Sequence, residues 1–196
     1  MATVNFNFSS VFDKDVIINR NGTTTDPTQD GLSVWNETLV TQTFATFKVG
    51  ANGNGLPDNG FFAANSYHPA IQLGYSNSSD GNNAKILNTN NTSFTFNVTS
   101  GQYSAIHLFA TSADGTAGIE VKFNYSDGTN ETKTGSLPDW FDTISETSDK
   151  YYLIDGMDRS FDVTGSSYDD ANTVALYGLK FAPNSSKSLP GIAQFH

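Results

Sequence analysis

Apolar side chains recur at every second position in this sequence, and this period most constrains the fold. Successive residues of a strand face opposite sides of a sheet, so the pattern predicts half-buried strands. A helical period persists for three turns in no segment. The runs place these residues on common faces: Val4, Phe6 and Phe8; Val40, Phe44 and Phe47; Phe94, Phe96 and Val98; Ile106 and Leu108; Ile119, Val121, Phe123 and Tyr125; and Val174, Leu176, Leu179 and Phe181, with Gly178 as a candidate bulge.

Turn residues separate these runs, mostly as Asn-Gly, Asp-Gly or Ser-Gly pairs. About ten strands at this spacing predict an all-β chain, an antiparallel β-sandwich of the jelly-roll type. The sequence has no internal repeat and no linker, so we expect residues 1–196 to form a single domain. Residues 19–31 and 50–66 are long and polar, and we expect them to be loops that carry function.

One segment predicts a hairpin with an aromatic pair at its end. The turn is expected at residues 126–129, where Gly128 can adopt a positive φ without steric cost. The return strand, residues 130–137, is polar enough for a solvated face or a sheet edge. Pro138 ends it, and residues 139–141 (Asp-Trp-Phe) follow at the rim.

The composition excludes several classes of function. A net charge of −10 repels a phosphate backbone, so we expect no nucleic-acid partner. Cysteine is absent, which excludes disulfides, thiolate catalysis and the usual zinc sites. There is no apolar run long enough to predict a membrane span. The N-terminal residues lack the pattern of a signal peptide, which leaves a cytoplasmic protein, unusual export or a mature secreted chain open.

Residues 101–141 combine a Tyr-Ser strand ending in Ala-Thr with a Tyr-x-Asp-Gly-Thr hairpin and an Asp-Trp pair. This combination resembles β-sandwich modules appended to bacterial secreted glycoside hydrolases, similar in kind to galactose-binding-like modules and jelly-roll lectins. Residues 174–192 look like the closing strands of those modules, whereas residues 50–85 depart from them. The resemblance implies a non-catalytic, extracellular, sugar-recognising sandwich, in some cases with calcium.

Asp139 and Trp140 are the first candidate ligand residues. An exposed Trp can stack on the apolar face of a sugar ring while a carboxylate accepts hydroxyl hydrogen bonds. The alternative is structural: a rim Trp that seals the sandwich edge, with Asp139 accepting hydrogen bonds from nearby backbone amides.

A second candidate site lies in residues 56–69, which combine a tight turn with aromatic, Asp, Asn and His side chains. An aromatic wall with a few polar groups suits galactose-type recognition. The alternative is a loop plug whose rings fill the mouth of the sandwich. The residues that we expect to bind sugar here are Asp58, Asn59, Phe61, Phe62 and His68.

Asp80, Asn82 and Asn83 form a candidate calcium site. Calcium takes six to eight oxygen ligands, and these side chains surround Gly81 within one turn. The spacing is not that of an EF-hand, and an ordinary turn rich in Asp and Asn explains the same residues.

These observations favour a lectin-like carbohydrate-binding protein whose partners are glycans or glycoconjugates. Single shallow sites bind weakly, so a homo-oligomer would raise the affinity. Two alternatives from other classes stay open. One is a small jelly-roll polysaccharide lyase or glycoside hydrolase, which would need a cleft with perturbed ionisable groups. The other is a structural or adhesive module that contacts protein.

Overall fold

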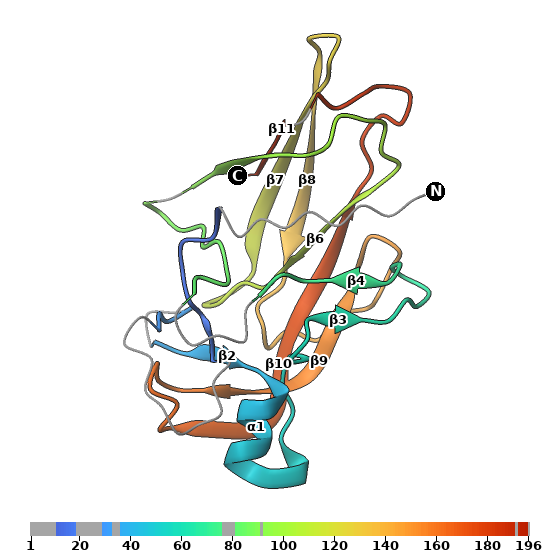
Figure 1. The fold of residues 1–196 in the computed structure, drawn as a ribbon. Coiled ribbons are helices and arrows are strands. Elements are labelled where there is room, and N and C mark those ends of the chain that lie inside the picture. The colour runs from blue at the N-terminus through green and yellow to red at the C-terminus, as the bar shows by residue number, and fades with distance from the viewer. Residues whose placement is uncertain are drawn as a thin grey trace. The chain divides into compact units, whose positions relative to one another are not determined.

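The computed structural model describes residues 11–18, 29–32, 36–75, 81–90, 92–190 and 192–195. Strands dominate these residues (Figure 1), which confirms the predicted β-rich class. The elements are β1 (Ile17–Ile18), β2 (Thr38–Val40), α1 (Gln42–Val49), η2 (Gly50–Asn52), β3 (Phe61–Phe62), β4 (Ile71–Gln72), β5 (Phe94–Asn97), β6 (Ile106–Ala110), β7 (Ala117–Asn124), β8 (Asn130–Leu137), β9 (Lys150–Ser160), β10 (Tyr168–Phe181) and β11 (Ile192–Phe195).

The described strands form three open sheets, with strand orders β1-β2-β9-β10-β6, β5-β11-β7-β8 and β3-β4. β1 and β2 run parallel, which departs from the purely antiparallel arrangement that we predicted. The predicted strand through Val4, Phe6 and Phe8 lies outside the described residues.

The chain divides into two compact units. Unit 1 consists of residues 1–86 and 153–175, and unit 2 of residues 87–152 and 176–196. β9 and β10 supply residues to both units. The single domain stays a prediction.

In unit 2, β7 shows the alternation that the sequence predicts. The predicted inner face is buried: Ile119, Val121, Phe123 and Tyr125. The neighbouring Glu120 and Lys122 stay partly exposed. A period of two is therefore sufficient to identify the face of this strand that packs into the core.

The two larger sheets contact each other within unit 2. A Cβ atom on Gly135 of β8 would lie 3.3 Å from the ring of Phe181 on β10. Gly135 therefore admits the Phe181 ring between the sheets.

The β7–β8 hairpin matches its prediction. The Tyr125 amide donates to the Thr129 carbonyl at 2.8 Å, and Gly128 has φ 82°. The Asp127 carboxylate accepts hydrogen bonds from the Thr129 amide and hydroxyl, at 3.0 and 2.6 Å. β8 coincides with the predicted return strand, residues 130–137.

In unit 1, the segment that we predicted as a strand through Val40, Phe44 and Phe47 is instead helix α1 from residue 42 onward. The strand prediction was wrong because the spacings of four and three residues are helical. Phe44 and Ala45 are buried with Ile18 and Val40. The core contact therefore determines the conformation of a segment whose local signals are weak.

Gly178 was a candidate bulge, but β10 stays in continuous register with β6. Gly178 pairs with Phe109 and Leu179 with Leu108, so β10 has no bulge at Gly178 on the side that faces β6. Close packing explains why this position is a glycine. A Cβ atom at this position would overlap the ring of Tyr151 and lie 2.7 Å from its hydroxyl oxygen.

Asp162 organises the turn between β9 and β10. Its carboxylate accepts hydrogen bonds from the Thr164 amide and hydroxyl at 2.8 and 2.6 Å, and from the Ser166 and Ser167 amides at 3.1 and 2.8 Å. Burial raises the pKa of this carboxyl, but these hydrogen bonds to its ionised form outweigh burial and lower the pKa from 3.8 to about 2.

This pKa shift predicts a contribution of Asp162 to acid stability. Because the folded pKa lies below the unfolded one, the contribution is complete above about pH 4 and is lost as the pH falls towards about 2. The free energy of unfolding of wild type should therefore exceed that of Asp162→Ala by an amount that narrows over this range. Urea titrations of both proteins at several pH values measure the difference. A difference that does not change between about pH 5 and pH 2 would contradict the prediction.

Within the described residues, there is no helix of the length and hydrophobicity needed to cross a membrane.

Candidate functional site

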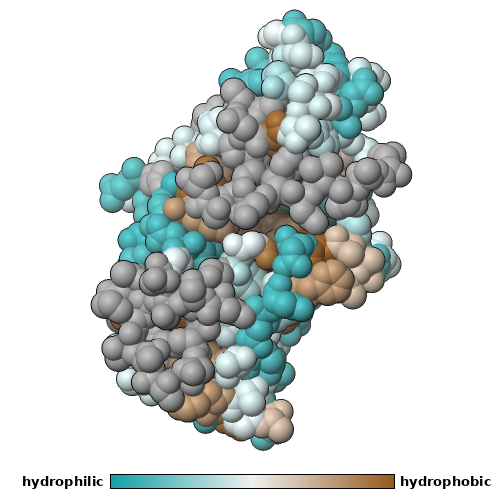
Figure 2. Space-filling model, in the orientation of Figure 1, coloured by the Kyte–Doolittle hydropathy of each residue, from teal (hydrophilic) through white to brown (hydrophobic). Residues whose placement is uncertain are grey.

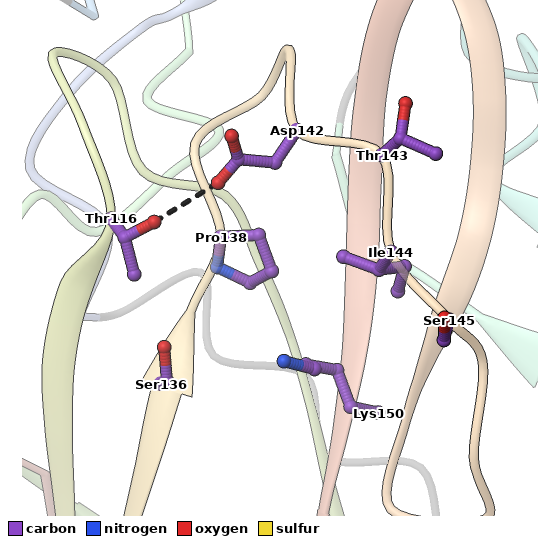
Figure 3. Close-up of a pocket in the computed structure, with 8 residues that line it drawn as sticks. All are labelled: Thr116, Ser136, Pro138, Asp142, Thr143, Ile144, Ser145 and Lys150. Atoms are coloured by element: carbon purple, nitrogen blue, oxygen red, sulfur yellow. Dashed lines mark hydrogen bonds between the residues drawn. The ribbon is translucent and has the colours of Figure 1, made fainter.

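Unit 2 carries an open depression of about 450 Å³. Figure 3 shows its wall, in which hydroxyl, carboxylate and ammonium groups surround Pro138. The lining residues are Thr116, Ser136, Pro138, Asp142, Thr143, Ile144, Ser145 and Lys150. They come from the start of β7, the end of β8, the turn after β8 and the first residue of β9.

Backbone hydrogen bonds fix the turn that follows β8. The Trp140 amide donates to the Ser112 carbonyl at 2.9 Å. The Tyr177 hydroxyl lies 2.8 Å from the carbonyl of Asp139 and 2.6 Å from that of Asp142. β10, through Tyr177, thereby holds both ends of the turn, so this side of the depression is preorganised.

Asp142 and Lys150 are the charged groups of the wall. One carboxylate oxygen of Asp142 accepts a hydrogen bond from the Thr116 hydroxyl at 2.9 Å and another from the Asp139 amide at 3.0 Å. The Lys150 ammonium extends across the depression in Figure 3, and it forms no ion pair or hydrogen bond with any described residue. The wall therefore offers a held acceptor and an ammonium donor to a polar ligand.

The predicted pair Asp139 and Trp140 lies beside the depression but does not face it as a binding surface. Trp140 is 1% exposed, so its ring offers no open face. The Asp139 carboxylate accepts hydrogen bonds from the Gly115 amide at 2.6 Å and from the Phe141 amide at 3.0 Å. The exposed aromatic ring in this turn is Phe141, 44% exposed, with its centroid 5.2 Å from that of Trp140.

Asp58, predicted to bind sugar, lies in unit 1 at the start of α1. Its two carboxylate oxygens accept hydrogen bonds from the Thr43 amide and hydroxyl, both at 2.9 Å. The Thr41 side chain makes no capping hydrogen bond at this end. The first amides of a helix lack partners within it and favour negative charge. Asp58 therefore caps α1 across 15 residues of sequence.

The other predicted residues of segment 56–69 divide into buried and exposed groups. Phe62 and His68 are buried, and the His68 Nδ1 atom lies 2.7 Å from the Pro69 carbonyl oxygen. Phe61 is 47% exposed, and the exposed Asn59 accepts a hydrogen bond from the Phe61 amide at 3.0 Å. Hydrophobic residues reach the surface at this β3–β4 hairpin in Figure 2. The structure thus places Phe61 and Asn59, but not the buried pair, where a ligand has access.

The predicted calcium ligands are only partly described. Asp80 lies outside the described residues, and Asn82 is exposed. Asn83 is buried, and its side-chain oxygen accepts hydrogen bonds from the Val16 and Ile17 amides at 2.8 and 3.2 Å. In the part of the chain that is described, no three His, Asp or Glu side chains are close enough to hold a metal ion. Calcium stays a prediction.

Sequence reasoning missed the ligand residues that line the depression and identified only their neighbours Asp139 and Trp140. Asp142 follows Trp140 by two positions, and this proximity was the only signal that could have identified it. Thr116, Ser136 and Lys150 belong to separate segments, and no spacing in the sequence connects them.

The sequence matches no known family model and no curated protein.

Proposed function

We propose that this chain is a non-catalytic, lectin-like carbohydrate-binding protein and that the depression of unit 2 is its ligand site. The observation that carries the proposal is the lining itself. Hydroxyl, carboxylate and ammonium groups line one open depression. The ends of strands and the turn that the Tyr177 hydroxyl holds fix their positions. Sugars present many hydroxyls, each of which needs a donor or acceptor, and a preformed concave site supplies them at low entropic cost.

Each group of the wall has a role in this proposal. The Asp142 carboxylate accepts a hydrogen bond from a sugar hydroxyl. The Lys150 ammonium donates one to a hydroxyl or ring oxygen. Pro138 and Ile144 contact the apolar C–H face of the ring. Phe141, exposed in the same turn, extends the contact to a second sugar unit.

We propose a β-sandwich of the jelly-roll type; the Gly135–Phe181 contact supports face-to-face packing of two sheets. Galactose-type sugars are the first ligands to test, because residues 101–141 resemble sugar-recognising modules. Calcium belongs to the same proposal, with Asp80 and the exposed Asn82 among its expected ligands.

A glycan-array screen of the purified protein, with calcium and again with EDTA, tests the function. We expect selective binding to one family of glycans, and loss of binding in EDTA would assign a metal to the protein. An array without signal in both conditions would argue against the lectin function for the glycans displayed. Release of reducing ends from a polysaccharide would instead support the hydrolase alternative.

The matched variants Lys150→Met and Lys122→Met test the site. Lys150→Met should weaken glycan binding about tenfold or more, because a hydrogen bond to a charged group contributes about 1.5–3 kcal/mol. Lys122 lies on β7 of the same unit and does not line the depression, so its replacement should leave binding unchanged. Isothermal titration calorimetry with the best glycan measures both.

Equal affinities for wild type and Lys150→Met would place the binding site elsewhere. The exposed Phe61 and Asn59 of the β3–β4 hairpin would then be the next surface to test.

A further inference from the structure

Among the described residues, no strand pairs with the outer edge of β8. Within the described part of the chain, β8 is hydrogen-bonded to β7 alone and ends the strand order β5-β11-β7-β8. The Tyr125 amide donates to the Thr129 carbonyl, so these two residues form a hydrogen-bonded pair of the antiparallel ladder. Such pairs alternate, and the next one is Phe123 with Glu131.

The odd-numbered residues of β8 therefore direct their backbone N–H and C=O groups towards β7. The even-numbered residues direct theirs away from β7. The outward peptide groups are those of Asn130, Thr132, Thr134 and Ser136. Their backbone N–H groups form no hydrogen bond to any residue that the structure describes, and their side chains are exposed. The strand has eight residues and contains no proline. Natural edge strands are protected from pairing by proline, bulges, short length or charged side chains. The regular β8 has only the last of these, in Glu131 and Lys133.

The charges on β8 are complementary to those of a second β8. Glu131 and Lys133 lie two residues apart on one face, with 2.5 Å between their charged atoms and side-chain exposures of 31% and 39%. When two copies of β8 pair antiparallel through outward peptide groups, the twofold axis must pass through a residue. An axis at Thr132 sets Glu131 of each copy opposite Lys133 of the other, which is favourable.

The neighbouring registers are unfavourable. An axis at position 131 sets two glutamates opposite each other, and an axis at position 133 sets two lysines opposite each other. Charge therefore selects the register centred on Thr132.

We propose that the protein forms a homodimer by antiparallel pairing of β8 with β8 of a second copy, centred on Thr132. The two edges together make one continuous sheet. The outward peptide groups of Asn130, Thr132 and Thr134 then hydrogen-bond across the axis. The proposal does not depend on the proposed function, although a dimer would give a glycan-binding chain two sites.

Thr132→Pro tests the backbone pairing in the full chain. Proline removes the outward N–H at the centre of the interface, and an edge strand tolerates it there because that N–H does not bond to β7. Sedimentation velocity should show wild type as a dimer and Thr132→Pro with half its mass, while thermal unfolding confirms that the variant is folded. A monomeric wild type at every concentration would overturn the proposal, and so would a dimeric, folded Thr132→Pro.

Two charge variants test the charge pairing across the interface. Glu131→Lys gives two positive charges on each β8 and Lys133→Glu gives two negative ones, so neither should dimerise with itself. A mixture of the two should form a heterodimer, because every lysine then faces a glutamate. Neither variant retains the Glu131–Lys133 pair within its own chain, so recovery in the mixture can arise only between chains. Failure of the mixture to dimerise would overturn the proposed charge pairing between the two β8 strands.

Discussion

Replacing Trp140 with Ala is expected to lower the free energy of unfolding by about 3–5 kcal/mol. Trp140 is among the largest fully buried side chains of the described residues, at 1% exposure. Removing it loses the transfer free energy of the indole and leaves a cavity beside the turn that Tyr177 holds. For a chain of this length, the loss corresponds to a decrease in Tm of roughly 6–20 °C. Denaturant titration and thermal scanning measure both quantities.

Phe141→Ala is the matched control, since the next ring in the chain is 44% exposed. Its removal should change stability by less than about 1 kcal/mol. Trp140→Ala also separates the two roles considered for Trp140. A sugar-stacking Trp140 would lose binding on replacement and keep its Tm. An unchanged Tm in Trp140→Ala would show that the ring does not support the core.

The sequence predicts the β7–β8 hairpin almost completely because its signals are local. Strict alternation from Ile119 to Tyr125 identifies the buried face, and Asp127-Gly128 supplies the turn. Each signal depends on residues adjacent in the chain. The register of the two strands follows from the turn, and it is observed.

Helix α1 could not be predicted in the same way. It has eight residues, of which Thr43, Thr46 and Val49 are β-branched and weak helix formers. Its support is non-local, from the packing of Phe44 on unit 1 and from Asp58, whose carboxylate bonds to Thr43. No window of the sequence contains these contacts together.

The sequence predicted residues that lie beside the candidate site, but not the groups that line it. Asp139 and Trp140 form a recognisable pair in the turn after β8, yet the indole is buried and the carboxylate accepts hydrogen bonds from backbone amides. The accessible groups next to them, Asp142 and Lys150, come from a turn and a strand end. Side-chain orientation decides which residues of such a turn meet solvent, and it depends on the fold around the turn.

Replacing Gly178 with Ala is expected to destabilise the protein by about 3 kcal/mol or more, at the upper end of the range for overpacking. The added Cβ would overlap the ring of Tyr151. Neither the β10 backbone at Gly178 nor the Tyr151 ring can move easily. β10 is fixed by its register with β6, and Tyr151 is 0% exposed with its hydroxyl 2.7 Å from the His107 Nδ1 atom. Denaturant titration measures the loss.

Gly118→Ala on β7 is the matched control, because a Cβ there meets no atom within 4 Å. Its stability should stay within about 0.5 kcal/mol of wild type. Tyr151→Ala supplies the second test. It removes the ring that the methyl group added by Gly178→Ala would overlap. The double variant should therefore be no less stable than Tyr151→Ala alone. The losses in free energy of unfolding of the two single variants should not add. Additive losses would mean that Gly178 is required for the backbone conformation of β10. A strongly non-additive double-mutant cycle would show that Gly178 is required because the Tyr151 ring packs closely against β10.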